Sequence, residues 1–213
     1  MLENCNNGGL TTASLSGKPA LPNDRRQHAR HVSVLRVAKI NTPRSEELCL
    51  VRNISGKGMM VHVYSDLCVG DPVSTEFNSG KPIAGRIIWH REGMIGIEFD
   101  ESLDPDSILS GTNSVPAAPH PRPPRVGLEL HGRIRVGSRY QTVTLCNISQ
   151  GGANIRPSEP DTVLEKVVLM VNGLPPIAGS VRWQDEEHAG IEFDIPVSFE
   201  VLARWVPSVR RQG

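Results

Sequence analysis

Short runs in which apolar and polar residues alternate recur through most of the chain. A period of two is typical of β-strands with one buried face. The first such run is 31–37, and 41–47 after it is polar and contains a proline, as expected of a turn. Five further strand-like runs follow at close spacing: 48–51, 59–63, 73–77, 83–89 and 94–99. Six short strands without a strong helical pattern between them predict an antiparallel β-barrel.

The second half of the chain repeats the first at a constant spacing of 94 residues. A constant spacing means that both copies share their strand and turn lengths, so the sequence predicts two tandem copies of one β-domain. Four blocks carry the repeat: Asn-Ile-Ser-x-x-Gly at 53–58 and 147–152, Pro-Ile-Ala-Gly at 82–85 and 176–179, Trp89 and Trp183, and Gly-Ile-Glu-Phe-Asp at 96–100 and 190–194.

The segments outside the repeats differ in composition. Residues 1–23 are rich in Gly, Asn, Ser and Thr and are expected to form a flexible tail. Residues 104–124 are rich in Pro and Ser and are expected to form a linker between domains at 24–103 and 125–206. The stretch 197–206 has helical spacing, with Val197, Val201, Arg204 and Trp205 on one face and Phe199, Leu202 and Val206 near it. Its equivalent in the first copy is a short stretch at about 105–109.

Composition and charge narrow the class of protein. The 213 residues include 23 basic and 23 acidic ones, and this neutral balance disfavours a barrel that binds nucleic acid. The start of the chain has no secretion signal and no apolar run is long enough to span a membrane, so we expect a cytoplasmic protein without membrane insertion. The four cysteines have no metal-binding spacing and are expected to be reduced thiols.

The sequence does not resemble an enzyme or a metalloprotein. The seven histidines are scattered, and no nucleophile elbow, zinc-protease motif or phosphate-binding loop is present. Glu98 and Glu192 recur with their strand, so we expect them to serve the fold. We predict no catalytic residues and no metal site.

Two clusters in the first copy carry candidate binding chemistry. Arg25, Arg26 and Arg30 precede the first strand, and guanidinium groups bind phosphate, the guanine O6/N7 edge and purine faces. The second cluster is a turn with Asn53, Ser55 and Gly58, in which the amide and hydroxyl donate or accept and the glycine is expected to adopt φ > 0. Together they suit a small ligand with phosphate and guanine.

Arg-x-x-x-Arg (Arg26, Arg30) followed by Asn-x-Ser-x-x-Gly (Asn53, Ser55, Gly58) resembles the PilZ family, bacterial receptors for cyclic di-GMP. The resemblance implies an all-β chain of two tandem six-stranded antiparallel barrels, each followed by a short helix. It implies cyclic di-GMP as the ligand, with no further cofactor, bound by Arg25, Arg26, Arg30, Asn53, Ser55 and Gly58. Arginine at position 25 further implies a stacked ligand dimer. Asn53 stands where most members have Asp, which removes a charge-assisted bond to guanine.

The second copy keeps the turn but lacks the arginine pair. The segment 120–125 before its first strand contains three prolines, and neither register rebuilds Arg-x-x-x-Arg there, although a one-residue gap places Arg125 opposite Arg30. We therefore expect Asn147 and Ser149 to be structural and the second copy to be degenerate. Trp89 and Trp183 occupy matching positions and are expected to serve packing in the core or at the rim. The alternative function is a PilZ-type adaptor that binds an unknown protein partner and no nucleotide.

Overall fold

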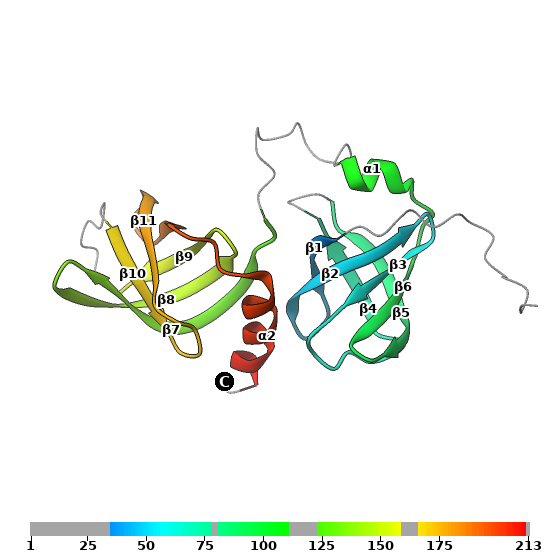
Figure 1. Ribbon diagram of the computed structural model, residues 1–213, viewed down its shortest axis with the longest axis horizontal. Coiled ribbons are helices and arrows are strands. Elements are labelled where there is room, and N and C mark those ends of the chain that lie inside the picture. Colours follow the sequence, from blue (N-terminus) through cyan, green and yellow to red (C-terminus); the bar gives the residue numbers. More distant parts are fainter. Residues whose placement is uncertain (1–34, 78–80, 111–122, 159–165, 212–213) are drawn as a thin grey trace, which may run out of the picture.

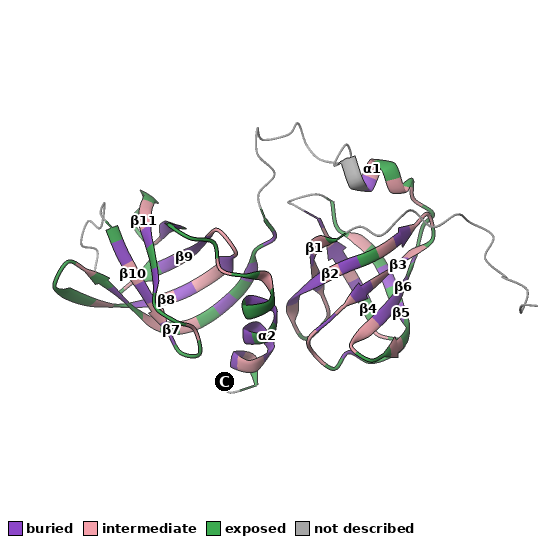
Figure 2. Ribbon diagram, in the orientation of Figure 1, coloured by how far each residue is buried: buried purple, intermediate pink, exposed green. Residues whose placement is uncertain are grey.

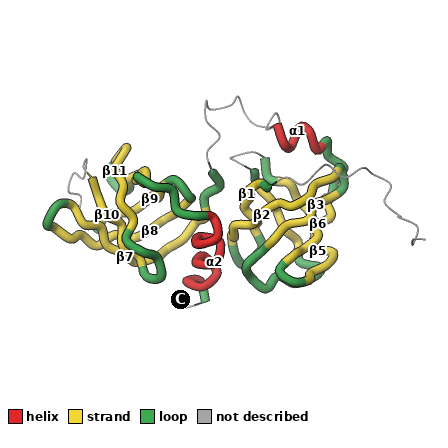
Figure 3. The backbone as a smooth tube through the Cα atoms, in the orientation of Figure 1, coloured by secondary structure: helices red, strands yellow, loops and turns green. Residues whose placement is uncertain are grey.

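A computed structural model describes residues 35–77, 81–110, 123–158 and 166–211. Within these ranges the chain forms two closed six-stranded antiparallel β-barrels that lie side by side (Figure 1). Strands and turns make up most of the backbone, with one short helix after each barrel (Figure 3). The predicted fold class is confirmed. None of the helices in the described ranges is long and apolar enough to cross a membrane.

The first barrel closes in the order β1-β2-β3-β6-β5-β4. Its strands are β1 (Arg36–Asn41), β2 (Glu46–Ser55), β3 (Gly58–His62), β4 (Pro72–Glu76), β5 (Ile83–Arg91) and β6 (Met94–Phe99). Helix α1 (Pro105–Ser110) follows, and it lies at the beginning of the predicted linker, 104–124. Ile108 of α1 packs in the core of this barrel.

The second barrel has the equivalent strand order, β10-β11-β12-β9-β8-β7. Its strands are β7 (Val126–Val136), β8 (Arg139–Ser149), β9 (Gly152–Pro157), β10 (Lys166–Val171), β11 (Ile177–Gln184) and β12 (Ala189–Phe193). Helix α2 (Phe199–Arg210) follows the last strand.

The repeat extends to individual backbone hydrogen bonds. The Leu103 N–H donates to the Gly56 carbonyl at 2.7 Å, and the Val197 N–H donates to the Gln150 carbonyl at 2.8 Å. Both barrels also have register shifts at equivalent places, in the strands that carry the Asn-x-Ser turn and the tryptophan: at 51/53 and 87/89 in the first, and at 145/147 and 181/183 in the second. Residues that are 94 positions apart in the sequence therefore have the same backbone hydrogen bonds and the same register shifts in the two barrels.

The first strand begins later than the sequence pattern indicates. The structure places β1 at Arg36–Asn41, where Ala38 and Ile40 point into the core, while part of the predicted strand at 31–37 lies outside the described residues. The turn is also shorter than 41–47, because the Thr42 hydroxyl oxygen accepts hydrogen bonds from the N–H groups of Arg44 and Ser45 and closes the chain within four residues. The predicted boundaries of this hairpin were wrong, although the hairpin itself is present.

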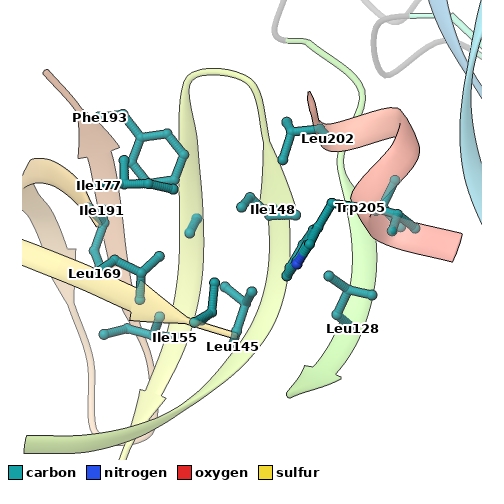
Figure 4. Packing of buried hydrophobic residues seen from close by; sticks show 14 of the residues in the cluster. Leu128, Leu145, Ile148, Ile155, Leu169, Ile177, Ile191, Phe193, Leu202 and Trp205 are labelled. Carbon is teal, nitrogen blue, oxygen red and sulfur yellow. The ribbon is translucent and has the colours of Figure 1, made fainter. Parts of the chain in front are cut away.

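Each barrel encloses a core of mainly aliphatic side chains, and buried and exposed positions alternate along most strands (Figure 2). In the second barrel, α2 contributes to the core. Leu202 and Trp205 reach from the helix onto Leu128 and Ile148 at the edge of the barrel interior (Figure 4). This helix is therefore part of the second hydrophobic core.

The buried face of α2 agrees only in part with the predicted face. Leu202, Ala203, Trp205, Val206 and Val209 are buried, whereas Val201 is 42% exposed and Arg204 is exposed. The prediction counted from Val197, but the helix begins at Phe199 with Ser198 as its N-cap, where the Ser198 hydroxyl accepts from the Val201 N–H. Trp205 is buried as predicted, but Val201 and Arg204 are not, because the core of the second barrel takes the side of the helix that carries Leu202, Val206 and Val209.

Helix α2 lies between the two barrels and contacts β2 of the first (Figure 1). Leu48 points outward from β2, yet it is only 2% exposed because it packs in the core cluster of the second barrel. The Glu46 carboxylate accepts a hydrogen bond of 2.7 Å from the Gly127 N–H on β7. These contacts form an interdomain seam to which both barrels contribute side chains.

Aromatic and charged groups extend this seam. The rings of Tyr64 and Phe199 meet edge to face with centroids 5.9 Å apart. The Arg204 guanidinium lies 5.3 Å from the centre of the Tyr64 ring, while two of its nitrogens donate to the Glu200 carboxylate. The first barrel therefore gains cover from a helix that belongs to the second.

Candidate functional site

The residues predicted to bind ligand divide into two groups. Arg25, Arg26 and Arg30 lie outside the described residues. Asn53, Ser55 and Gly58 lie in the hairpin that joins β2 to β3, where Ser55 pairs with Gly58 and Asn53 pairs with Met60. The structure therefore brings together the turn half of the predicted site.

Ser55 closes this hairpin. Its hydroxyl donates to the Gly58 carbonyl at 3.0 Å, and the Ser149 hydroxyl donates to the Gly152 carbonyl at 3.2 Å in the second barrel. The same bond in both copies is a structural contribution of the serine. The oxygen of Ser55 keeps acceptor capacity for a ligand, because a hydroxyl that donates one bond still has two lone pairs.

Gly58 is required for close packing. Its φ is not positive, so the prediction of a left-handed conformation was wrong. A Cβ atom at this position would lie 2.3 Å from the Ile97 carbonyl oxygen on β6, and a Cβ at Gly152 would lie 2.4 Å from the Ile191 carbonyl oxygen. The glycine is needed because the neighbouring strand passes directly beside it.

Replacement of either glycine by alanine is expected to lower the free energy of unfolding of its own barrel by about 1–3 kcal/mol, because backbone cannot move away as a side chain can. Urea unfolding of Gly58→Ala and Gly152→Ala measures this loss. Gly151→Ala is the matched control, since nothing lies within 4 Å of a Cβ there. Equal stability of Gly152→Ala and Gly151→Ala would contradict the steric explanation.

The two turn asparagines have different surroundings. The Asn147 side-chain oxygen accepts a hydrogen bond of 2.9 Å from the Arg125 guanidinium. No described residue forms a hydrogen bond with the side chain of Asn53, which is half-buried. The sequence repeat makes these positions equivalent, but only the first asparagine presents an open amide.

Asn53 belongs to a row of outward-facing residues across four strands. The register places Asn53 opposite Met60, Met60 opposite Gly96, and Gly96 opposite Trp89. Directly opposed residues share a face of the sheet, and the neighbouring Ile54 points into the core. The row therefore forms a strip on the outside of the first barrel that runs from the turn to the tryptophan.

Both repeated tryptophans pack over a glycine on this outer surface. A Cβ on Gly96 would lie 2.0 Å from Nε1 of Trp89, and a Cβ on Gly190 would lie 2.1 Å from Nε1 of Trp183. The side chains remain 38% and 45% exposed, respectively. The ring-over-glycine pair is common to both barrels and explains why glycine starts the Gly-Ile-Glu-Phe-Asp block.

The interdomain seam begins one row away from Asn53. His62 is the next outward residue of β3 after Met60, and its ring meets the ring of Tyr64 edge to face at 4.7 Å. Partial burial lowers the pKa of His62, and the positive charges of Arg52 and Arg204 lower this pKa further, while Glu200 raises it. The outer face of the first barrel next to the Asn53 turn thus adjoins the surface against which α2 packs.

The remaining His, Cys, Asp and Glu side chains were candidates for a metal site or for titration chemistry. Within 35–77, 81–110, 123–158 and 166–211, no group of His, Cys, Asp and Glu is arranged to hold a metal ion. Cys49 is fully buried, and burial strongly raises the pKa of its thiol. Glu98 and Glu192 lie on the outer surfaces of their strands, where Glu192 pairs with Arg182.

Comparison with solved structures finds several matches along most of the chain. The PlzA protein of Borreliella burgdorferi in complex with c-di-GMP is 12% identical, over 82% of this chain and 88% of that chain, with a TM-score of 0.33. The Bacillus subtilis inhibitor of motility MotI/DgrA is 15% identical, over 85% and 98%, with a TM-score of 0.33. YcgR of Escherichia coli in complex with c-di-GMP is 9% identical, over 84% and 85%, with a TM-score of 0.30. A search of curated proteins finds no match.

The class of the protein is defined by two closed barrels in tandem, each with an Asn-x-Ser-x-x-Gly turn between its second and third strands. The family model described as PilZ domain matches residues 24–110 and 120–206, one region for each barrel. The chain therefore belongs to the PilZ family and contains two PilZ domains.

Proposed function

We propose that this protein is a cyclic di-GMP receptor that binds the nucleotide at its first PilZ domain. The observation that carries the proposal is the difference between the two turns. The first domain combines Arg-x-x-x-Arg with an Asn53 side chain that no described residue engages, whereas Arg125 occupies Asn147 in the second. Proteins of the PilZ family are binding proteins rather than enzymes, which agrees with the absence of catalytic motifs in the sequence.

In this proposal each motif serves one part of the ligand. Arg26 and Arg30 donate to the phosphates and to the Hoogsteen edge of guanine. The Asn53 amide pairs with the edge of a guanine that lies on the barrel surface, and the oxygen of Ser55 accepts a further bond. Gly58 lets β6 pass directly beside the turn, and in this way it helps to hold the turn against the ligand. Arg25 stacks on or bonds a second molecule, so that a dimer of cyclic di-GMP fills the site.

The second domain is proposed to be a non-binding copy. Arg125 already uses the oxygen of Asn147, and a ligand would have to displace this charge-assisted bond. Prolines at 121, 123 and 124 fix the backbone before β7, so this segment is poorly suited to closing over a nucleotide. The second domain instead contributes α2, which covers β2 of the first domain.

We infer that ligand binding is transmitted to a protein partner through the interdomain seam. Strand β2 carries the Asn53 turn at one end and Leu48 and Glu46, which contact the second domain, at the other. In this proposal, the segment that carries Arg26 and Arg30 closes on the Asn53 turn. This closure would exert a force on β2, the strand against which α2 packs. A receptor for an intracellular messenger acts in the cytoplasm, and this is where we place the protein.

Calorimetric titration of the wild-type protein with cyclic di-GMP tests the receptor function. We expect binding with two ligands per chain, and a loss of at least about 10-fold in affinity in Arg30→Ala, because a hydrogen bond to a charged group contributes about 1.5–3 kcal/mol. Arg44→Ala is the matched control, since Arg44 is an exposed residue of the β1–β2 turn. GMP serves as the control ligand, because it lacks the second guanine.

The alternative function gives a different result in the same experiment. A wild-type protein that releases no heat with cyclic di-GMP at micromolar concentration would contradict the receptor function and favour an adaptor that binds protein alone. Equal weakening by Arg30→Ala and Arg44→Ala would contradict the assignment of the site.

A further inference from the structure

We propose that the outer surface of the second barrel over β10, β7 and β8 is a docking surface for a protein partner that presents carboxylates beside apolar side chains. We call this surface the arginine face, and its members are Arg133, Arg135, Tyr140, Val168 and Met170. The inference goes beyond the receptor function, because the face lies on the domain that we do not expect to bind the nucleotide.

The register of the second barrel brings the five residues together. Arg135 on β7 lies opposite Tyr140 on β8 and opposite Val168 on β10. Arg133 lies opposite Met170 on β10. Directly opposed residues share a side of the sheet, so two cations adjoin an aromatic ring and two apolar side chains.

The arginine face points to the outside of the barrel. Ile134, between the two arginines, is fully buried, and successive residues of a strand face opposite sides. Arg133 and Arg135 are accordingly exposed, and Tyr140 is 64% exposed. The face is therefore open to a partner as far as the described residues are concerned.

The equivalent surface of the first barrel is balanced in charge. The Lys39 ammonium lies 3.4 Å from the Glu46 carboxylate and 3.2 Å from the Glu76 carboxylate. Asn41 also donates a hydrogen bond of 2.7 Å to Glu76. Every polar group named here has a partner within the first barrel.

The second barrel keeps the cation and loses both carboxylates. The spacing of 94 residues and the identical register give these equivalents: Arg133 for Lys39, Arg135 for Asn41, Tyr140 for Glu46 and Met170 for Glu76. Two cations without an anion thus replace one cation between two anions. No described residue forms an ion pair with Arg133 or Arg135, and carboxylates are left for a partner to supply.

The first barrel already uses this surface for docking. Glu46 accepts a hydrogen bond from the Gly127 N–H, and Leu48 beside it packs in the second core. In the second barrel, β7 begins at the interdomain seam with Gly127, whereas Arg133 and Arg135 lie further along the strand and stay exposed. The same surface of one fold is therefore covered in the first domain and open in the second.

The side chains of the face favour a protein over a nucleic acid. Arginine, tyrosine and methionine are enriched in protein–protein interfaces, where apolar neighbours keep water away from the polar contacts. Two arginines are few for a nucleic acid, whose binding depends on many phosphate contacts. A guanidinium forms paired hydrogen bonds with a carboxylate. Alternate strand residues lie about 7 Å apart, so two carboxylates one helical turn apart can reach both arginines.

Selection of phage-displayed random dodecapeptides on the full-length protein, without cyclic di-GMP, tests the arginine face. We expect the selected peptides to be rich in Asp and Glu next to apolar residues. Fluorescence anisotropy with the most enriched peptide is expected to show at least about 10-fold weaker binding by Arg133→Ala and by Arg135→Ala, because each loses hydrogen bonds between charged groups. Arg44→Ala is the matched control, since Arg44 is an exposed residue of the first domain.

A second variant leaves both arginines in place. Tyr140→Glu combined with Met170→Glu gives the second barrel the two carboxylates of the first. We expect this variant to lose peptide binding, because the new carboxylates engage the guanidinium groups as Glu46 and Glu76 engage Lys39. Circular dichroism checks that the barrel, whose core does not include these positions, stays folded.

Three results would overturn the proposal. The first is a selection that enriches no acidic peptide, and the second is an acidic peptide that binds both alanine variants as tightly as the wild type. The third is arginine-dependent binding of duplex DNA or of phosphatidylglycerol vesicles that is tighter than binding of the peptide, which would assign the face to another anionic surface. Failure of the receptor function would appear in the cyclic di-GMP titration alone, since peptide selection needs no nucleotide.

Discussion

Trp205→Ala is expected to lower the free energy of unfolding of the second domain by about 3–5 kcal/mol, as is usual when a large aromatic side chain is removed from a core. Trp205 is 4% exposed and belongs to the core of the second barrel, although it comes from α2 (Figure 4). Its Nε1 donates to the Asn172 carbonyl at 2.8 Å, and its ring lies against Gly173, which has a φ of +81°. The substitution removes packing and leaves a carbonyl without its partner.

Val201→Ala on the same helix is the matched control, because Val201 is 42% exposed. We expect its effect to stay within about 0.5 kcal/mol, as for most surface positions. Urea unfolding followed by tryptophan emission and by circular dichroism measures both variants. If Trp205→Ala and Val201→Ala were equally stable, α2 would not be a part of the second core.

Leu48→Asp is expected to separate the two domains while the first barrel stays folded. Leu48 points outward from β2, so the barrel interior does not depend on it, but it is only 2% exposed and packs in the core cluster of the second barrel. The substitution removes the free energy gained by burying the leucine side chain, which is about 1.5–3 kcal/mol. It also places a carboxylate among the apolar side chains of the second core, which adds a desolvation cost, because Lys39, the residue opposite on β1, already pairs with Glu46 and Glu76. The two effects act in the same direction against docking.

Small-angle scattering measures this separation as an increase in the radius of gyration. Leu35→Asp is the matched control because Leu35 is 69% exposed, and we expect it to leave the scattering unchanged. Circular dichroism checks that Leu48→Asp keeps its strands. A radius of gyration equal to that of the wild type would show that the seam does not depend on Leu48.

A separated but folded Leu48→Asp variant also has a use for the proposed function. Its affinity for cyclic di-GMP would show whether docking of the second domain influences the site. The Asn53 turn and Leu48 lie on the same strand, and His62 and Tyr64 continue the seam next to Met60. If the seam transmits binding, undocking alters the affinity, because coupling between two sites acts in both directions.

Much of the fold could be predicted because strand patterns are local in the sequence and the same patterns occur in both copies of the repeat. The alternation of apolar residues in 83–89 and 94–99 becomes β5 and β6, and the blocks spaced by 94 residues have the same strand pairs and register shifts. The boundaries of the β1–β2 hairpin failed for a local reason, the turn at Thr42, but two other failed predictions depended on neighbours that are distant in the sequence. Gly58 is required by the approach of β6, which no local pattern reveals. The face of α2 is set by the barrels on either side of it.

The candidate site was predicted only in part for the same reason. Motif spacing indicated Asn53 and Ser55, and the structure places them in the β2–β3 hairpin. Their different surroundings in the two domains could not be predicted, because Arg125 and Asn147 are 22 residues apart and meet only after β7 pairs with β8. Trp89 was marked by the repeat and Met60 by no pattern, and only the register of the sheet places both in one row with Asn53.

The sequence alone determined that the protein consists of two copies of one β-domain and that only the first copy has the arginine pair. These features depend on period, spacing and residue type, which are properties of short segments. The tertiary structure decided that α2 joins the second core and covers the first barrel. It also decided that Leu48, on the outer face of the first barrel, is buried in the core of the second, and that Asn53, Met60 and Trp89 form one strip. Barrel closure and domain docking bring distant residues together, and these contacts exist only once both barrels have formed.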